Sequence, residues 1–219
     1  MSTSVKICGL TTAETLTAAL DAGADMVGFV FYEPSPRFVG LETARALAMQ
    51  ARHRAEIVAL TVDAQDATLE AILRRVAPDY FQLHGRESPE RLAEIQEKYG
   101  VSAIKAIGVA DAADLALADT YQSADALLID AKPPKGAILP GGNGVPFDWR
   151  LVRNFHPRKP WMLSGGLTPE NVAQAIRESR ARSVDVSSGV ESAAGVKDPA
   201  KIRAFIDAAR AGFEAIEQE

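Results

Sequence analysis

Residues 161–189 read WMLSGGLTPENVAQAIRESRARSVDVSSG, and this stretch contains one complete strand–helix–strand unit. Its first apolar run ends in a glycine pair, and its last apolar run ends in two serines. Between the two runs, Thr168 stands before Pro169 and Glu170, which is typical of a helix start with proline at the first helical position. Two strands joined in this way are expected to lie parallel in one sheet.

The same unit recurs along the whole chain. Eight short runs have the character of strands: VKIC, MVGFVF, IVALTV, YFQLH, AIKAIG, ALLID, WMLSG and SVDVSS. Helical patterns separate them, and Ser88 and Asp198 mark two further helix starts because each stands before a proline. The alternation predicts an α/β protein, and eight strands predict a closed (βα)8 TIM barrel. Residues 1–219 are therefore expected to form a single domain.

One connection is longer than the others. It follows the sixth predicted strand, covers residues 131–146 and is rich in proline and glycine (AKPPKGAILPGGNGVP). Such connections usually have about 2–6 residues, so a lid or a binding loop is the favoured interpretation. A plain surface insertion is the alternative.

The composition limits where the protein works and what it binds. Cys8 is the single cysteine among 219 residues, so an intramolecular disulfide is impossible and a reducing, cytoplasmic setting is expected. The net charge is −5, and Lys and Arg are scattered, which argues against nucleic acid as a partner. No membrane association is expected either, because no apolar run approaches the ~20 residues of a transmembrane helix.

The ends of the predicted strands are polar, and active sites of such barrels lie at the carboxyl ends of the strands. The polar residues that close or follow the strands are Cys8, Arg37, Gln82, His84, Asp130, Ser164, Asp185, Ser187 and Ser188. Side chains two apart on a strand point the same way, so Lys6 is expected beside Cys8. An ammonium neighbour favours a thiolate, which predicts an environment that lowers the pKa of Cys8. The alternative is that Cys8 is only a small buried hydrophobic residue.

The residues after the seventh and eighth strands give the strongest general signal for a ligand. Gly165 and Gly166 follow the seventh strand, and Ser187, Ser188 and Gly189 follow the eighth. Backbone N–H groups and hydroxyls bind anions, and phosphate occupies this position in many barrels. A phosphorylated small molecule is therefore the predicted partner.

Seven motifs occur in order along the chain: KICGL, PSPR, QLHG, LLID, GGNG with FDW, SGGL and VDVSSGVE. Together they resemble the phosphoribosylanthranilate isomerases of tryptophan biosynthesis. The resemblance implies an isomerase, formally an intramolecular oxidoreductase, that needs no cofactor and no metal. It implies an Amadori rearrangement of N-(5-phosphoribosyl)anthranilate to 1-(2-carboxyphenylamino)-1-deoxyribulose 5-phosphate.

The resemblance also implies roles for individual residues. Cys8 is the implied general base and Asp130 the implied general acid, while Arg37 is the implied partner of the anthranilate carboxylate. The other implied substrate-binding residues are Lys6, Gln82, His84 and Asp185. The implied phosphate-binding residues are Gly165, Gly166, Ser187, Ser188 and Gly189. His84 contacts the substrate or holds a neighbouring side chain, and both interpretations stay open. No role is carried over to Asn143 or Asp63, where the motifs differ from the family's usual pattern.

Three other functions compete with the isomerase. A metal-dependent sugar-phosphate epimerase needs several strand-end ligands, but of the three histidines only His84 ends a strand. An indole-forming synthase barrel of the same pathway needs lysine and glutamate at its strand ends. A non-catalytic sensor of a phosphorylated ligand has no use for both Cys8 and Asp130. A monomer and a homodimer are equally compatible with the sequence.

Overall fold

The protein is a closed barrel of eight parallel strands in the order in which they follow one another in the chain. The computed structural model describes residues 3–132, 141 and 147–218. The strands are β1 (Ser4–Cys8), β2 (Met26–Val30), β3 (Glu56–Thr61), β4 (Tyr80–Leu83), β5 (Ser102–Val109), β6 (Ala126–Ala131), β7 (Trp161–Leu163) and β8 (Ser183–Val186). The pairing of β1 with β8 closes the barrel. The predicted α/β class and the (βα)8 TIM barrel are confirmed.

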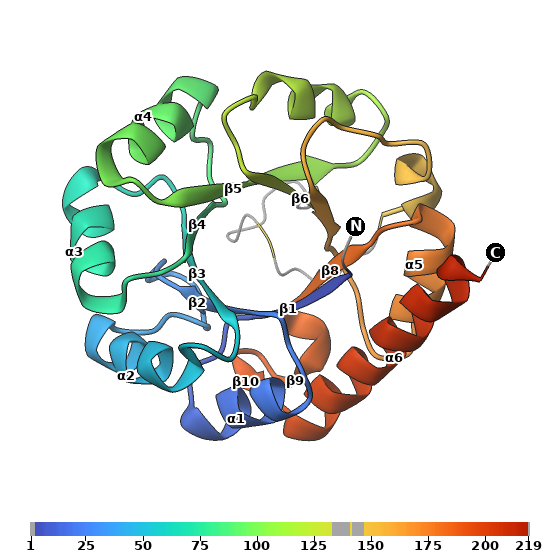
Figure 1. Ribbon diagram of the computed structural model, residues 1–219, viewed down its shortest axis with the longest axis horizontal. Coiled ribbons are helices and arrows are strands. Elements are labelled where there is room, and N and C mark those ends of the chain that lie inside the picture. Colours follow the sequence, from blue (N-terminus) through green and yellow to red (C-terminus); the bar gives the residue numbers. More distant parts are fainter. Residues whose placement is uncertain (1–2, 133–140, 142–146, 219) are drawn as a thin grey trace.

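Helices surround the barrel on its outside (Figure 1). The α-helices are α1 (Ala13–Asp21), α2 (Leu41–Ala51), α3 (Asp66–Val76), α4 (Pro89–Tyr99), α5 (Val172–Ser179) and α6 (Pro199–Glu217). Two short 3-10 helices, η1 (Asp114–Thr120) and η2 (Trp149–Val152), follow β5 and β6. A regular helix was expected after β5, but the Asp111 carboxylate accepts from the backbone of Ala113 and Asp114 and tightens the turn there.

The helix starts agree with the sequence in two of three cases. The Ser88 hydroxyl caps α4 and the Asp198 carboxylate caps α6, each before a proline. The expected cap at Thr168 is wrong, because α5 begins only at Val172. The Asn171 side chain accepts from the Thr168 amide at 2.8 Å and donates to the Gly166 carbonyl at 2.9 Å, so it closes a turn before the helix.

An additional hairpin follows β8, which the sequence analysis did not predict. The 3-10 helix η3 (Ser188–Val190) leads into β9 (Glu191–Ala193) and β10 (Val196–Lys197), which pair antiparallel before α6 begins. Gly195 makes the tight connection at φ +79°, a conformation that other residues rarely adopt. This hairpin brings two charged side chains, Glu191 and Lys197, to the barrel mouth.

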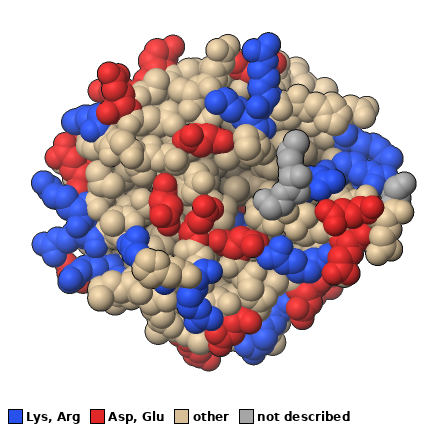
Figure 2. Space-filling view, viewed as in Figure 1, with Lys and Arg blue, Asp and Glu red and all other residues tan. Residues whose placement is uncertain are grey.

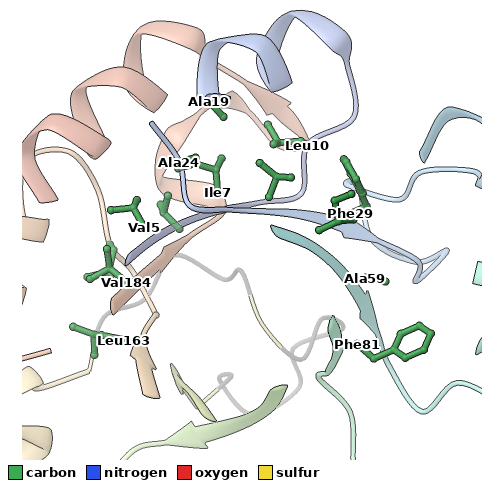
Figure 3. Packing of buried hydrophobic residues seen from close by; sticks show 14 of the residues in the cluster. Val5, Ile7, Leu10, Ala19, Ala24, Phe29, Ala59, Phe81, Leu163 and Val184 are labelled. Carbon is green, nitrogen blue, oxygen red and sulfur yellow. The ribbon is translucent and has the colours of Figure 1, made fainter. Parts of the chain in front are cut away.

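The hydrophobic core has two parts, because alternate strand residues face opposite sides of the barrel wall. Outward-facing side chains such as Val5, Ile7 and Phe29 pack beneath the helices (Figure 3). A smaller cluster fills the barrel, and its buried members are Met26, Val58, Ile104, Leu128 and Met162. Met26 begins β2, and two half-buried residues that pack against this cluster, Tyr80 and Ala126, begin β4 and β6, so this filling lies toward the amino-terminal ends. Another small cluster inside the barrel, Cys8, Val30 and Leu60, lies toward the carboxyl ends of β1, β2 and β3, beside the polar side chains there.

Figure 2 shows acidic and basic side chains mixed along the rim of one face and several acidic side chains nearer its centre, without a large patch of one sign. Within the ranges that the structure describes, no helix is long and apolar enough to cross a membrane.

Candidate active site

Cys8 and Asp130 both lie at the carboxyl ends of barrel strands and are nearly buried. Their exposed fractions are 3% and 6%. Cys8 ends β1 and Asp130 is the last residue but one of β6. Gly28 of β2 makes room for the thiol, because a Cβ at this position would lie 2.9 Å from the Cys8 Sγ atom. The two predicted catalytic groups therefore lie at the same end of the barrel, with β7 and β8 between the strands that carry them.

The environment of Cys8 differs from the prediction. Burial raises the pKa of the Cys8 thiol above its ordinary value, and the nearby Asp185 carboxylate raises it further. Lys6 and Lys197 act in the opposite direction but do not outweigh burial. The expected lowering of the pKa is therefore wrong, because the desolvation of the thiolate outweighs the attraction of the two ammonium groups.

Lys6 and Asp185 form a buried ion pair below the thiol. The Lys6 Nζ atom donates to Asp185 Oδ1 at 2.7 Å, and the Ser164 hydroxyl donates to Asp185 Oδ2 at 3.0 Å. Burial lowers the pKa of Lys6, but Asp185 and Cys8 together reverse this and raise it. Lys6 lies beside Cys8 as predicted. Its positive charge is paired with the Asp185 carboxylate, so it does not act on the thiol alone.

Asp130 is held by its own backbone and by His84. Its Oδ1 atom accepts from the Ala131 amide at 2.8 Å, and its Oδ2 atom lies 3.3 Å from His84 Nε2. The Gln82 amide nitrogen lies 3.0 Å from His84 Nδ1. An amide nitrogen donates, so Nδ1 accepts from Gln82 and Nε2 is the ring nitrogen that faces Asp130. Gly141 covers this pair closely, since a Cβ there would clash with His84 Nε2.

A second buried ion pair supports the segment that carries His84. The Lys105 Nζ atom in β5 donates to Glu87 Oε2 and the Gly85 carbonyl, both at 2.8 Å, and to the Leu83 carbonyl at 3.2 Å. Glu87 in turn accepts from the backbone amide of Asp63 at 2.8 Å. The Lys105–Glu87 ion pair thus connects the loop after β3 and the loop after β4 to β5.

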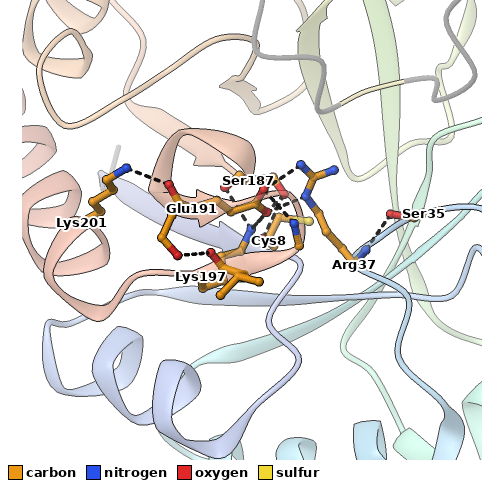
Figure 4. Close-up of polar contacts among 10 residues, drawn as sticks. Cys8, Ser35, Arg37, Ser187, Glu191, Lys197 and Lys201 are labelled. Carbon is orange, nitrogen blue, oxygen red and sulfur yellow. Dashed lines mark hydrogen bonds and ion pairs between the residues drawn. The ribbon is translucent and has the colours of Figure 1, made fainter.

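Arg37 lies at the mouth but already has a protein partner. Its Nε and Nη2 atoms donate to the two Glu191 carboxylate oxygens at 2.7 and 3.0 Å (Figure 4). The Lys197 Nζ atom donates to the same carboxylate at 2.7 Å. Burial raises the pKa of Glu191, but Arg37 and Lys197 reverse this and lower it. The sequence did not lead to Glu191 and Lys197 as site residues. The available signal was that these two oppositely charged residues stand on either side of Gly195, shortly after the serine pair.

The predicted phosphate-binding residues come together at the ends of β7 and β8. Gly165 and Gly166 both have positive φ, at +85° and +65°, so that successive amides form a concave backbone. Gly189 packs directly against the Leu167 carbonyl, which joins the two strand ends. In the described part of the chain, the amides of Gly165 and Gly166 donate to no backbone or side-chain acceptor. Ser187 donates its hydroxyl to the Cys8 carbonyl at 3.2 Å.

Of the long connection 131–146, only Ala131, Lys132 and Gly141 belong to the described residues. The lid or binding-loop prediction for the remainder, including Asn143, falls outside them. Lys132 lies on the surface and pairs with Asp114 at 2.7 Å. No group of three or more potential metal ligands occurs among the residues described.

Comparison with known proteins identifies the family. The family model described as N-(5'phosphoribosyl)anthranilate (PRA) isomerase matches residues 5–208. The chain belongs to this family. A phosphoribosylanthranilate isomerase of Bradyrhizobium diazoefficiens is 57% identical over 219 residues, which is 100% of this chain and 98% of the relative. One from Cereibacter sphaeroides is 57% identical over 207 residues, covering 94% and 98%.

Solved structures of the isomerase family have the same fold. The Thermotoga maritima enzyme superposes with a TM-score of 0.86 at 37% identity, covering 96% of this chain and 100% of that one. A second structure, described as a complex with reduced 1-(o-carboxyphenylamino)-1-deoxyribulose 5-phosphate, has a TM-score of 0.82 at 35% identity, covering 96% and 100%. The resemblance read from the seven motifs is confirmed, together with the function class of an isomerase.

Proposed function

We propose that this chain catalyses the Amadori rearrangement of N-(5-phosphoribosyl)anthranilate, with Asp130 as general acid and Cys8 as general base. The observation that carries the proposal is the placement of a buried thiol and a buried carboxyl at the mouth of one barrel whose sequence matches the isomerase family over residues 5–208. A relative's structure is described with a reduced analogue of the corresponding ketose product.

The first step opens the ribose ring. Asp130 donates a proton to the ring oxygen while the bond between that oxygen and C1′ breaks, and the anthranilate nitrogen forms a double bond to C1′. His84 keeps the Asp130 carboxyl at a fixed position through the 3.3 Å contact between Nε2 and Oδ2. His84 is therefore assigned to positioning the acid, the second of the two interpretations, with Gln82 fixing its ring.

The second step removes the proton from C2′. The Cys8 thiolate takes this proton, and the electron pair moves into a C1′–C2′ double bond and neutralises the protonated imine, which gives the enolamine. Because burial raises the pKa of the Cys8 thiol, an additional positive charge has to favour the thiolate when it takes the proton. Ring opening supplies one, since the protonated imine forms next to C2′.

The binding groups surround these two residues. Gly165, Gly166, Ser187, Ser188 and Gly189 are assigned to the phosphate, because the positive-φ glycines and the serine-rich turn offer backbone N–H groups, and Ser188 a hydroxyl, to an anion. Arg37 is assigned to the anthranilate carboxylate. Its Nη1 edge is available for this, because Glu191 occupies Nε and Nη2. Lys6 and Asp185 are assigned to the sugar side of the site through their buried pair.

Turnover can be followed by the loss of anthranilate fluorescence when phosphoribosylanthranilate is generated in the cuvette. Each positioned acid or base typically supplies about 10²–10⁴ in rate, so C8S and D130N should each lose at least about 100-fold while circular dichroism stays unchanged. An unprocessed substrate with the wild-type protein would refute the isomerase assignment. Near-wild-type rates of either folded variant would refute the role of that residue.

Three further predictions accompany this function. The partner is a phosphorylated small molecule, with neither nucleic acid nor membrane involved. The protein works in the cytoplasm as a monomer or a homodimer. One structural relative, from Thermotoga maritima, is described as monomers generated from a dimeric isomerase. Sedimentation at several concentrations distinguishes the two states for this chain.

A further inference from the structure

Lys197 is a buried ammonium group that the mechanism above does not use. It lies in β10 and is almost completely shielded from solvent. Its Nζ atom donates to the Ser187 carbonyl at 2.9 Å, to the Ser187 hydroxyl at 3.3 Å and to Glu191 Oε1 at 2.7 Å. Three donors meet three acceptors, so Lys197 is fixed in place and has no free donor for a substrate.

The same network reaches the proposed base. Ser187 accepts from Lys197 and donates its hydroxyl to the Cys8 carbonyl at 3.2 Å. Figure 4 shows Cys8, Ser187, Glu191 and Lys197 gathered at one side of the mouth. Lys197 is also one of the two cations whose charge acts on the Cys8 thiol. A buried cation that holds the neighbour of a catalytic thiol influences both its position and its charge.

A count of charges shows why Lys197 differs from Lys6. The Lys6 ammonium is matched by the Asp185 carboxylate at 2.7 Å, so this pair has no net charge. On the other side, Glu191 is shared by the two cations Arg37 and Lys197. Burial and the nearby Arg37 lower the pKa of Lys197, and the Glu191 carboxylate opposes them. With Lys197 in its ammonium form, the trio carries one surplus positive charge in a buried place, where charges act more strongly than in water.

Glu191 is held rigidly enough to keep the trio together. Besides the two cations, its Oε2 atom accepts from the Gly195 amide at 3.1 Å. Its backbone carbonyl accepts from Lys201 Nζ at 2.7 Å. The hairpin is thereby locked onto the start of α6, and the distance between Lys197 and β1 is set by the fold rather than by a flexible side chain.

We propose that Lys197 is a positioning residue that holds Ser187 and Glu191 in place and supplies the surplus positive charge that favours the thiolate form of Cys8. A role of Lys197 in catalysis rests on the proposed function of Cys8 as the base. The effect of Lys197 on the ionisation of the Cys8 thiol does not depend on that function. Near neutral pH, Lys197 therefore increases the fraction of Cys8 that is ionised and available to take a proton.

The thiolate fraction can be measured without substrate. Cys8 is the only cysteine of the chain, so alkylation by iodoacetamide near neutral pH, followed by intact-protein mass spectrometry, reports on this thiol alone. K197Q keeps amide donors but removes the charge. An opposite charge nearby shifts a pKa by about 1–3 units, and since Glu191 offsets part of this, we expect K197Q to be alkylated about tenfold more slowly than wild type.

Two variants serve as controls. K201M removes an ammonium that binds the same glutamate through its backbone carbonyl but lies on the exposed side of the hairpin, so its alkylation rate should stay within about twofold of wild type. K197R keeps the charge and should restore most of the rate. A merely structural role has the opposite sign, because looser packing exposes Cys8 and speeds alkylation.

An unchanged or faster rate in K197Q would overturn the proposal, and so would loss of the folded state in both K197Q and K197R. A slower rate in K201M equal to that in K197Q would overturn it as well. The turnover assay is then run on the same variants. If K197Q is alkylated slowly but turns over substrate at the wild-type rate, the role of Cys8 as base is wrong while the effect of Lys197 on the thiol stands.

Discussion

Replacing Lys105 with methionine tests whether the buried ion pair under His84 carries a large part of the stability. The Lys105 ammonium and the Glu87 carboxylate lie 2.8 Å apart, and their side chains are only 3% and 4% exposed. Methionine fills a similar volume but gives no donor. The Glu87 carboxyl then has no cation partner in a buried place, and the Leu83 and Gly85 carbonyls lose a donor.

The expected cost can be worked out from these contacts. Removing one partner of a buried ion pair costs about 3–5 kcal/mol, because the remaining charge is uncompensated. Glu87 still accepts from the amides of Asp63 and Gly85, so the lower end, about 3 kcal/mol, applies here. Each kcal/mol lowers the Tm of a chain of this size by about 2–4 °C, so K105M should melt about 6–12 °C below wild type.

Urea unfolding followed by circular dichroism measures this free energy, and thermal melting gives the shift in Tm. K98M is the matched control, since Lys98 pairs with Asp66 on the exposed face of α4 and should change the unfolding free energy much less. In the double variant K105M/E87Q the stranded charge is gone, so part of the loss should be recovered. A decrease below about 1 kcal/mol for K105M would show that the pair is not a significant source of stability.

Three further outcomes follow from single contacts. Burial raises the pKa of Cys8 in the native state, so the native state holds the thiol proton more tightly than the unfolded chain does. The free energy of unfolding should therefore fall as the pH rises above 9.0, the ordinary pKa of a thiol, and C8S should flatten this decline in urea titrations from pH 8 upward. G28A places a Cβ 2.9 Å from the Cys8 Sγ atom and should lower kcat without unfolding the protein, whereas G40A, which has open space, should leave kcat unchanged. S164A removes one of the hydrogen bonds to Asp185 and should cost about 0.5–1.5 kcal/mol in the same unfolding assay.

Much of this site could be predicted from sequence because a strand has a period of two and a barrel has one functional end. Lys6 beside Cys8, and Gln82 beside His84, followed from their spacing alone. The order of eight apolar runs was sufficient for the closed barrel. These features depend on local pattern, which a single sequence contains in full.

The features that escaped prediction depend on burial and on contacts between distant segments. The sequence places an ammonium near Cys8 but does not show how completely the thiol is shielded, and shielding decides the direction of its pKa shift. Arg37 and Glu191 are 154 positions apart, and nothing local indicates that they form a bidentate pair. The cap at Thr168 was wrong for a similar reason, because the Asn171 side chain competes for the same turn.

The acid and the base rest on two separate buried pairs of lysine and glutamate, and this separation has a measurable consequence. Lys105 and Glu87 support the loop that carries His84 and thereby Asp130, whereas Lys197 and Glu191 support Ser187 and Cys8. K105M should therefore slow ring opening most, and K197Q should slow removal of the C2′ proton most. With substrate deuterated at C2′, the isotope effect on kcat/KM reports how far proton removal limits the rate. It should be larger for K197Q than for wild type and smaller for K105M than for wild type. Equal isotope effects in the two variants would mean that the pairs support the mouth as one unit and do not serve the two steps separately.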